Sequence, residues 1–350
     1  MAVNVALVGL GYWGPNLART LASVDGAALR MLCDVRSERL TRFSTQYSQA
    51  QTTTDYQEVL RASDINAVVL ATPVHTHFEL AKAALEAGKS VLVEKPLAQT
   101  SAQCQKLISL AERNNVTLMV GHVFLYNAAV RKVKEYIQRG ELGQIYYIYS
   151  QRLNLGQVRQ DVNALWNFSP HDLSILSYWL DAPPSRVMAR GYSYLQPGIE
   201  DVVFMTLDFP SGIGANIHIS WLDPQKVRRM TIVGSEKMLV YDDVNADARI
   251  MLYDKGFTKQ PATKAVDPIT VSLGRYETFA EFQLLTRAGD LLIPKVSFTE
   301  PLKLECEDFI QSIRTGQRPL ADGYEGLQVV KTLEAAQASM SQHGLGVPIG

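Results

Sequence analysis

The stretch VNVALVGLGYWG at residues 3–14 places an apolar, β-branched run directly before a glycine-rich hexad, and a helical pattern over residues 15–23 follows. A G-x-G-x-x-G hexad alone arises easily by chance. Between a buried strand and a helix, it is typical of a dinucleotide-binding loop. The stretch therefore predicts that the chain opens with a Rossmann-type fold.

Each position of this loop has a physical role in the expected site. Gly9 allows the tight turn, Gly11 lets the backbone approach a pyrophosphate, and Gly14 lets the helix pack closely on the strand. Tyr12 and Trp13 lie between the last two glycines, and we expect them beside the cofactor. Amide groups and the dipole at the start of the helix then hold the anion.

Asp34 stands 20 residues beyond Gly14, at the end of the next apolar run. A carboxylate at this point accepts hydrogen bonds from the ribose hydroxyls and repels a 2′-phosphate, so it favours NAD over NADP. Arg36 follows two residues later and weakens this preference, because an arginine there can serve a 2′-phosphate. We expect Asp34 and Arg36 at the cofactor, with NAD preferred.

Strand and helix patterns alternate as far as Gly121. Further strands are expected at residues 29–33, 65–71, 90–93 and 117–120, and helices at 39–47, 78–85 and 101–114. This alternation is typical of a parallel sheet that is covered on both faces. The sequence therefore predicts an α/β domain over residues 1–121.

Beyond Gly121 the apolar runs alternate with polar residues, as in antiparallel strands. Strands are expected at 145–149, 202–208, 215–221, 229–233 and 238–241, and helices near 171–180, 301–314 and 323–341. We predict a second, α+β domain over residues 122–350, built on a large, open, mostly antiparallel sheet and used for substrate binding and oligomerisation.

Composition excludes several classes of protein. The chain has 350 residues, a formal net charge of −1 and 47% hydrophobic residues, which argues against a nucleic-acid partner and against disorder. No apolar run approaches the ~18 residues of a membrane span. Three widely spaced cysteines predict neither a disulfide framework nor a metal site. With no signal peptide at the start, we expect a cytoplasmic protein.

Glu94-Lys95-Pro96 follows a predicted strand, at the edge where open α/β sheets bind ligands. A lysine there can donate a hydrogen bond and a positive charge to an oxygen that becomes negative in a transition state. Taken alone, Lys95 fits an exposed loop residue better than a catalytic one.

The glycine loop, the segment ATPVHTH at residues 71–77, and Glu94-Lys95-Pro96 resemble, in order and spacing, the N-terminal signatures of the glucose-fructose oxidoreductase and inositol dehydrogenase family (Gfo/Idh/MocA). The resemblance covers essentially the whole chain. It implies an NAD(P)-dependent sugar or cyclitol dehydrogenase with Lys95 as the central catalytic residue and Glu94 near the cofactor. It also implies a nicotinamide-side segment made of Thr72, Pro73 and His77, with His75 beside it.

The family's second catalytic signature is an aspartate followed, four positions on, by a histidine. Here His171 matches the histidine, whereas Asn167 replaces the aspartate and cannot hold a charge. His171 is then the better candidate for a general base, because its ordinary pKa of about 6.5 suits proton exchange near neutrality. Ser169 and Asp172 fit a helix start, with Ser169 as the N-cap and Asp172 in the first turn.

Within the family, the segments at 11–16 and 166–175 look most like the branch that acts on carbon 3 of nucleoside-diphosphate hexoses, such as UDP-N-acetylglucosamine or its uronic acid. A free cyclitol or hexose is the alternative, and a non-catalytic NAD-binding sensor or scaffold is the second. We expect homodimers or homotetramers through the C-terminal sheet. Candidate substrate-binding residues are Tyr126, Asn127, Arg152, Asn154, Arg159, Asn167 and His171; Lys226, Arg228 and Arg229 form a second basic cluster that fits a solvated strand edge equally well.

Overall fold

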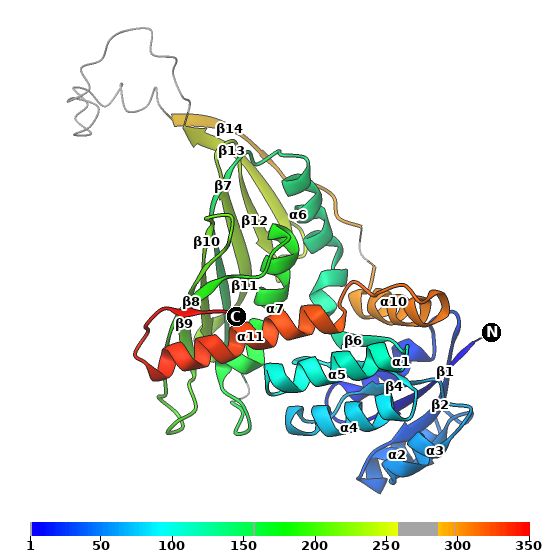
Figure 1. The fold of residues 1–350 in the computed structure, drawn as a ribbon. Helices are drawn as coiled ribbons and strands as arrows, with labels where there is room; N and C mark the ends of the chain where they lie inside the picture. Colours follow the sequence, from blue (N-terminus) through cyan, green and yellow to red (C-terminus); the bar gives the residue numbers. More distant parts are fainter. Residues whose placement is uncertain (1, 157, 258–285, 298) are drawn as a thin grey trace, which may run out of the picture.

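The computed structural model describes residues 2–156, 158–257, 286–297 and 299–350. Within these residues, hydrogen-bonded strands form two sheets, one of six strands and one of nine. Figure 1 shows the smaller sheet and its helices at the N-terminal end of the molecule, with the larger sheet rising from it.

The first sheet is parallel, in the order β3-β2-β1-β4-β5-β6. Its strands are β1 (Val3–Val8), β2 (Ala27–Cys33), β3 (Gln51–Thr53), β4 (Ala67–Leu70), β5 (Ser90–Glu94) and β6 (Leu118–Gly121). The helices between them are α1 (Gly14–Leu21), α2 (Ser37–Ser44), α3 (Tyr56–Arg61), α4 (Val74–Glu86) and α5 (Ser101–Arg113). This order confirms the Rossmann-type fold and places a binding crevice where it reverses, at the carboxyl ends of β1 and β4.

Alternate residues of each strand enter two separate cores, because successive side chains of a strand point to opposite faces. On β1, Val5 and Leu7 pack in one cluster with residues of α1, whereas Ala6 and Val8 pack in the other with residues of α4 and α5. The sheet is therefore buried on both sides.

Two C-terminal helices complete this packing. Leu302 and Phe309 of α10 (Pro301–Thr315) join the α1 side, and Leu327 and Val330 of α11 (Gly323–Ser341) join the α5 side. Figure 1 shows α11 running alongside α5 and onward beneath the larger sheet. The chain leaves the first sheet at Gly121, and helix α11 contributes to the cores of both sheets. The domain limits 1–121 and 122–350 stay a prediction.

The second sheet runs β14-β13-β12-β11-β7-β10-β9-β8-β15. Its neighbouring strands are antiparallel except β7 and β10, which confirms the mostly antiparallel sheet. The strands are β7 (Ile145–Leu155), β8 (Arg186–Tyr192), β9 (Val202–Asp208), β10 (Gly214–Ser220), β11 (Leu222–Gly234), β12 (Met238–Asp242), β13 (Ile250–Phe257), β14 (Thr286–Leu292) and β15 (Val347–Pro348). Strands β8, β13, β14 and β15 were not expected; in β8, Arg186 and Arg190 interrupt the apolar pattern.

One face of this sheet is covered and the other is open. The 3₁₀ helix η1 (Val123–Tyr126) and helices α6 (Ala128–Gln138), α7 (Ala164–Leu180) and α11 contribute to the core beneath it. The fully buried Trp179 of α7 donates a 2.9 Å hydrogen bond to the carbonyl of Val130 on α6. On the open face, the exposed rings of Tyr147 and Tyr149 stack with centroids 6.3 Å apart.

None of the helices in the described residues is long and apolar enough to cross a membrane. The three cysteines, Cys33, Cys104 and Cys306, are buried free thiols. Among the same described residues, no group of three or more histidine, cysteine or acidic side chains is placed to hold a metal ion.

Candidate active site

The glycine loop needs glycine at two of its three positions. Gly9 has a φ of +94°, and a Cβ there would lie 2.5 Å from the carbonyl oxygen of Ala71. A Cβ on Gly14 would lie 2.2 Å from the carbonyl oxygen of Gly9. Around Gly11 the nearest atom is Nη1 of Arg39, 3.7 Å from a built Cβ, so this side of the loop is open. The loop can therefore receive a pyrophosphate against its backbone.

The two aromatic residues of the loop take different positions. Tyr12 is exposed. Trp13 is half-buried and donates a hydrogen bond to the carboxylate of Glu94, which joins the loop to the end of β5. Burial raises the pKa of Glu94 to about 7, although the neighbouring Lys95 opposes this.

Asp34 lies buried at the end of β2 with its carboxylate fully engaged. Leu10 N–H donates to Oδ2 at 2.7 Å, Arg36 N–H donates to Oδ1 at 2.9 Å, and Arg39 Nη1 donates to Oδ2 at 3.1 Å. Burial alone would raise the pKa of Asp34, but these hydrogen bonds and the Arg39 charge outweigh it and lower that pKa. Asp34 is therefore ionised at neutral pH. The Arg36 side chain is exposed, and Arg39 was not anticipated from the sequence.

The segment before α4 is tied to the Lys95 segment by one histidine. His77 is buried, with Nδ1 2.8 Å from the carbonyl oxygen of Pro96 and Nε2 2.9 Å from that of Thr72. Its pKa is lowered, chiefly by burial. His75 and Pro73 are exposed at the helix start, so His77 acts here as a structural link and His75 lies towards solvent.

Lys95 bridges the two halves of the molecule. It follows β5, and its Nζ donates a 2.9 Å hydrogen bond to the backbone carbonyl of Asn167 on α7. It is therefore not the exposed loop lysine that the sequence alone also allowed. Burial lowers its pKa to about 8, against the attraction of Glu94 and with the help of three cations, Arg159, Arg152 and Arg228.

Helix α7 begins earlier than the sequence suggested. Asn163 is its N-cap and accepts a 3.1 Å hydrogen bond from Trp166 N–H. The expected N-cap, Ser169, lies inside the helix, and its hydroxyl donates to the carbonyl of Leu165. The expected helix start at Ser169 was therefore wrong. Pro170 mimics a first-turn proline in the sequence, yet it stands inside the helix, where it removes one backbone donor and its ring crowds the carbonyl four residues earlier.

Asp172 likewise has a different role from helix capping. Its carboxylate accepts from Ser150 Oγ at 2.8 Å and from Arg152 Nε at 2.5 Å, in a buried ion pair. The Arg152 guanidinium also lies over the ring of Phe124, 4.9 Å from its centroid. Arg152, expected to bind substrate, is thus held inside the protein, where its charge acts on its neighbours.

Two histidines flank Lys95 without hydrogen-bond partners among the described residues. The ring of His171 packs on Phe124 with centroids 4.9 Å apart, and its buried Nδ1 is unpaired. Burial, followed by Lys95 and nearby arginines, lowers the pKa of His171 well below 6.5. His122, directly after β6, is fully buried with both ring nitrogens unpaired, and burial lowers its pKa to about 3. Both rings are neutral near pH 7.

The predicted cleft residues Tyr126 and Asn127 do not form a cleft wall together. Tyr126 is buried in the core, and its hydroxyl donates a 2.6 Å hydrogen bond to Asp308 of α10. Its assignment to substrate binding was therefore wrong. Asn127 caps α6 and also donates a 3.3 Å hydrogen bond to Asp243.

Arg228 and Arg229 are neighbours on β11, so their side chains point to opposite faces of the sheet. Arg228 Nη1 lies 3.3 Å from Asp243, and its charge acts on both Lys95 and His171. Arg229 instead pairs with Asp242 at 2.7 Å. Lys226 is exposed and Asn154 half-buried, while Arg159 forms a two-pronged pair with Asp161.

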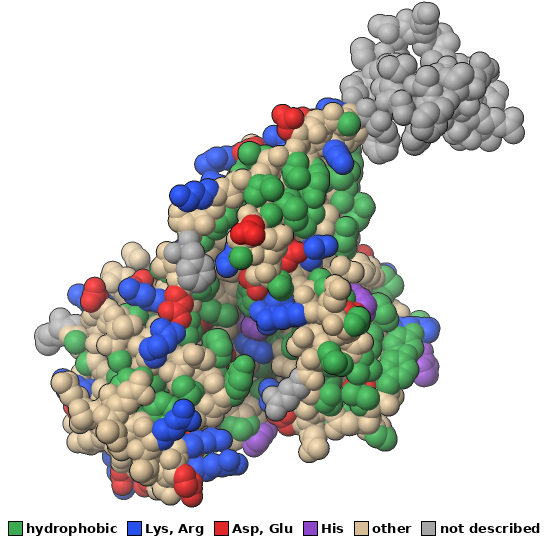
Figure 2. All heavy atoms as spheres, turned by 180° about the vertical axis from the view of Figure 1, so that it is seen from behind, with side chains coloured by type: hydrophobic (Ala, Val, Ile, Leu, Met, Phe, Trp, Pro, Cys, Tyr) green, Lys and Arg blue, Asp and Glu red, His purple; other side chains and the backbone are tan. Residues whose placement is uncertain are grey.

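Seen from behind, the surface is hollowed between the half that holds the first sheet and the lower end of the second. Lysine or arginine and histidine side chains gather on the floor of this hollow (Figure 2). The arrangement offers a neutral imidazole and a lysine of lowered pKa inside a positive field, which suits proton exchange with a hydroxyl.

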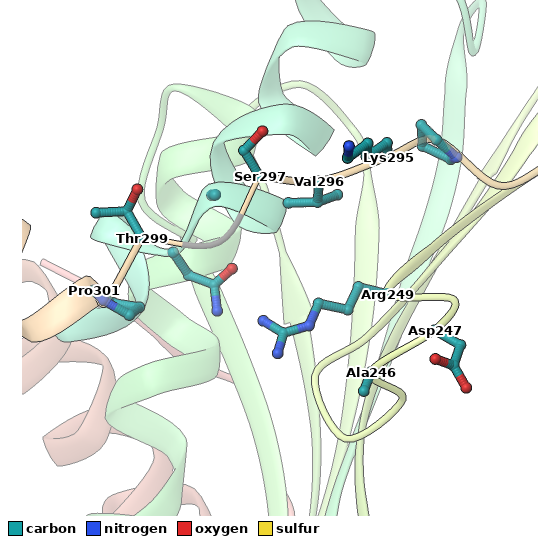
Figure 3. A pocket seen from close by; sticks show the side chains of 11 residues that line it. Ala246, Asp247, Arg249, Lys295, Val296, Ser297, Thr299 and Pro301 are labelled. Carbon is teal, nitrogen blue, oxygen red and sulfur yellow. The ribbon is translucent and has the colours of Figure 1, made fainter.

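A second cavity, of about 240 Å³, opens between the start of α6, the turn that joins β12 to β13, and the segment before α10. Arg249 reaches into it, whereas the carboxylate of Asp247 points away (Figure 3). Its wall includes Asn127, which links it through Asp243 to Arg228.

Comparison with known proteins shows the family to which this chain is similar. Residues 3–122 match the family model described as an oxidoreductase family with an NAD-binding Rossmann fold, and residues 130–240 match the GFO/IDH/MocA C-terminal domain. UDP-N-acetylglucosamine 3-dehydrogenase of Acidithiobacillus ferrooxidans is 23% identical over 94% of each chain. Inositol 2-dehydrogenase of Salmonella typhimurium is 26% identical over 63% of this chain and 67% of that protein. The WlbA dehydrogenase of Bordetella pertussis, solved with NADH and UDP-GlcNAcA, superposes with a TM-score of 0.79 at 22% identity, covering 100% and 98% of the two chains.

Proposed function

The chain belongs to the GFO/IDH/MocA family of NAD-binding oxidoreductases, and from that premise we propose that it oxidises or reduces carbon 3 of a nucleoside-diphosphate hexose. UDP-N-acetylglucosamine and its uronic acid are the model substrates. Two similar proteins support this choice by their names and bound ligands, one a UDP-N-acetylglucosamine 3-dehydrogenase and one solved with UDP-GlcNAcA.

The observation that carries the proposal is the positive field around Lys95. Arg159, Arg152 and Arg228 all act on Lys95, and two of them also act on His171. A neutral polyol has no need of such a field, whereas a diphosphate or a uronate gains from it. Arg228 is the best placed to meet an anion, because a single 3.3 Å contact with Asp243 leaves most of its donors free.

The residues of the chain handle the proton of the reacting hydroxyl. When bound, NAD supplies the hydride acceptor for oxidation, and NADH the donor for reduction. His171 stays neutral, so it can accept a hydrogen bond from the hydroxyl. Lys95, with a pKa of about 8, is closer to working pH and takes up or returns the proton. The lowered pKa of Lys95 supports giving the main acid–base role to Lys95, the expected central catalytic residue, with His171 as its partner.

The cofactor fits the residues present. The open backbone at Gly11 receives the pyrophosphate, and the ionised Asp34 accepts from the adenosine ribose. A 2′-phosphate would meet the Asp34 charge, so NAD is preferred. Trp13 and Thr72, on the two segments that flank the crevice, lie on the nicotinamide side.

We also assign oligomer formation to the open face of the second sheet. It exposes the aromatic rings of Tyr147, Tyr149 and Phe204, and an exposed apolar patch of this kind marks an interaction site. Sheet-to-sheet packing of two or four copies would cover it. Sedimentation at micromolar concentration tests this, and a monomer would contradict it.

The substrate assignment is tested by thermal shift and NADH absorbance. UDP alone, UDP-N-acetylglucosamine and its uronic acid should each raise the melting temperature, since ligands that bind the native state stabilise it. The two sugars should also give turnover with NAD.

Arg228→Gln should reduce the rise in melting temperature given by UDP sugars but not the rise given by NAD. The control Lys226→Gln changes an exposed cation on the same strand and should leave both unchanged. A response to inositol without one to UDP would favour the cyclitol alternative, and NAD binding without any turnover would favour the sensor.

A further inference from the structure

His122 is a buried histidine at the edge of the reaction centre. It directly follows β6, and the register of the sheet pairs Gly121 with Glu94, so His122 and Lys95 leave neighbouring strands side by side. The His122 side chain is fully buried, and neither ring nitrogen has a hydrogen-bond partner among the described residues. Buried polar groups are nearly always paired in proteins, so two unpaired nitrogens at this point indicate a function.

One short turn, η1, links His122 to His171. His122 is the N-cap of η1, and Phe124 of the same turn packs on the His171 ring, with centroids 4.9 Å apart. His171 is half-buried as a whole, but its Nδ1 is buried and unpaired. A substrate can therefore reach Nε2, while Nδ1 faces the interior.

The groups around His171 differ in whether they can accept a hydrogen bond. Besides burial, three cations and His122 lower the pKa of His171. The cations are Lys95, Arg152 and Arg228, and a charged lysine or arginine offers donors only. Burial, and then the charge of Lys95, hold the pKa of His122 at about 3, so its ring is neutral. A neutral imidazole has one acceptor nitrogen, and of these four groups His122 is the one that can accept.

We propose that His122 is a positioning residue, which accepts a hydrogen bond from Nδ1–H of His171 through one bound water and so keeps the His171 lone pair at Nε2, where the substrate lies. The tautomer of an imidazole is set by the hydrogen bond that its second nitrogen makes. The two rings share no direct hydrogen bond among the described residues, and buried waters commonly join unpaired groups of this kind. This role rests on the proposed function, in which His171 accepts a hydrogen bond from the reacting hydroxyl.

Nitrogen NMR on protein with isotope-labelled histidine reports the tautomer of each ring and needs neither cofactor nor substrate. The chain has six histidines, and the signals lost in His171→Gln identify that ring. Near neutral pH, wild-type His171 should carry its proton on Nδ1, whereas the exposed His343 should show the tautomer mixture of a free ring. His122→Phe fills the space without either nitrogen, so His171 should revert to a mixture. His122→Gln supplies an acceptor again and should restore the Nδ1–H form.

Turnover distinguishes this role from a purely structural one. With UDP-N-acetylglucosamine and NAD, His122→Phe should lower kcat about tenfold, the scale of one lost buried hydrogen bond, and leave KM within about twofold. His122→Gln should recover most of kcat. The matched control is Thr20→Val, because Thr20 Oγ1 is also buried and unpaired but lies on α1; it should change neither the His171 tautomer nor kcat.

The proposal is overturned if wild-type His171 carries its proton on Nε2, or if His122→Phe leaves both the Nδ1–H form and kcat as in the wild type. Should His122→Phe fail to fold, the wild-type tautomer decides alone. Absence of turnover with every UDP sugar would contradict the proposed function, but the NMR result would stand, because it is measured without substrate.

Discussion

Replacing Asp172 by asparagine should destabilise the protein strongly and disturb the reaction centre. The Arg152–Asp172 pair joins β7 to α7, with side chains only 6% and 1% exposed and Nε 2.5 Å from Oδ2. Removing the carboxylate leaves a buried guanidinium without a countercharge, at a cost of about 3–5 kcal/mol. An unfolding entropy of about 2.1 cal/mol/K per residue over 350 residues converts this to a fall in Tm of about 4–7 °C.

A matched control lies on the loop after β7. Arg159 and Asp161 form a pair of the same chemistry and the same 2.5 Å contact, but their side chains are 39% and 44% exposed. Asp161→Asn should therefore cost less than about 1 kcal/mol. The double change Arg152→Met with Asp172→Leu should recover most of the loss, because apolar residues replace a buried pair at little cost. Recovery should be incomplete, since Ser150 then loses its acceptor.

Urea and thermal unfolding of these variants give their free energies of unfolding. Adding the single variants Arg152→Met and Asp172→Leu completes the cycle that gives the coupling energy of the pair. Asp172→Asn should also lower the pKa of Lys95 further, because Arg152 is one of the cations that act on it, and the pH profile of kcat should shift towards acid accordingly. A loss below about 1 kcal/mol for Asp172→Asn, equal to that of Asp161→Asn, would refute the reasoning.

Three further outcomes are expected. Lys95→Ala should lower turnover by about 10²-fold or more, which is the scale of a lost acid–base group. Fluorescence titration should show that NAD still binds. Near-normal turnover would exclude this active site. Asn167→Asp should keep the Lys95 hydrogen bond, since the backbone carbonyl accepts it. The new negative charge should raise the pKa of Lys95 and move the pH profile of kcat towards base. An unmoved profile would mean that the side chain at position 167 lies away from Lys95. The wild-type protein should bind NAD at least about tenfold more tightly than NADP, because repulsion of a 2′-phosphate by Asp34 amounts to a few kcal/mol. Asp34→Ala should reduce this ratio. Equal affinities of the wild-type protein for NAD and NADP would contradict the role of Asp34.

Local signals predicted the first sheet and the cofactor loop well, because each depends on residues close in sequence. The strand before Gly9, the tight turn, and Asp34 at the next strand end are all set within 34 residues, and a positive φ at Gly9 leaves glycine as the natural choice. The place of Lys95 after a buried strand did not decide its role, which came from the resemblance to the family; its hydrogen bond to α7 spans 72 residues.

The failures have two origins: at the start of α7 two local capping patterns compete, and for Asp172 and Tyr126 the partners lie far along the chain. Ser169 and Pro170 imitate a helix start, and only the cap at Asn163 and the Arg152 partner of Asp172 show that α7 is already formed there. Tyr126 follows the crossover between the sheets, yet its hydroxyl acceptor is Asp308, 182 residues later. No pattern within one segment carries that information.

The three arginines around Lys95 differ in how easily each can exchange its aspartate for a ligand, and this divides their roles. Side-chain exposure rises from 6% for Arg152 to 36% for Arg228 and 39% for Arg159. A buried pair cannot be opened without leaving an uncompensated charge, whereas an exposed pair is worth at most about 1 kcal/mol and is readily exchanged. Arg152 therefore supplies a fixed field that holds down the pKa of Lys95 and His171. We therefore propose that Arg228 and Arg159 recognise an incoming diphosphate or carboxylate. Arg159 and Asp161 form an exposed pair, and Asp243 keeps Asn127 and Tyr241 as hydrogen-bond donors when Arg228 turns to a ligand.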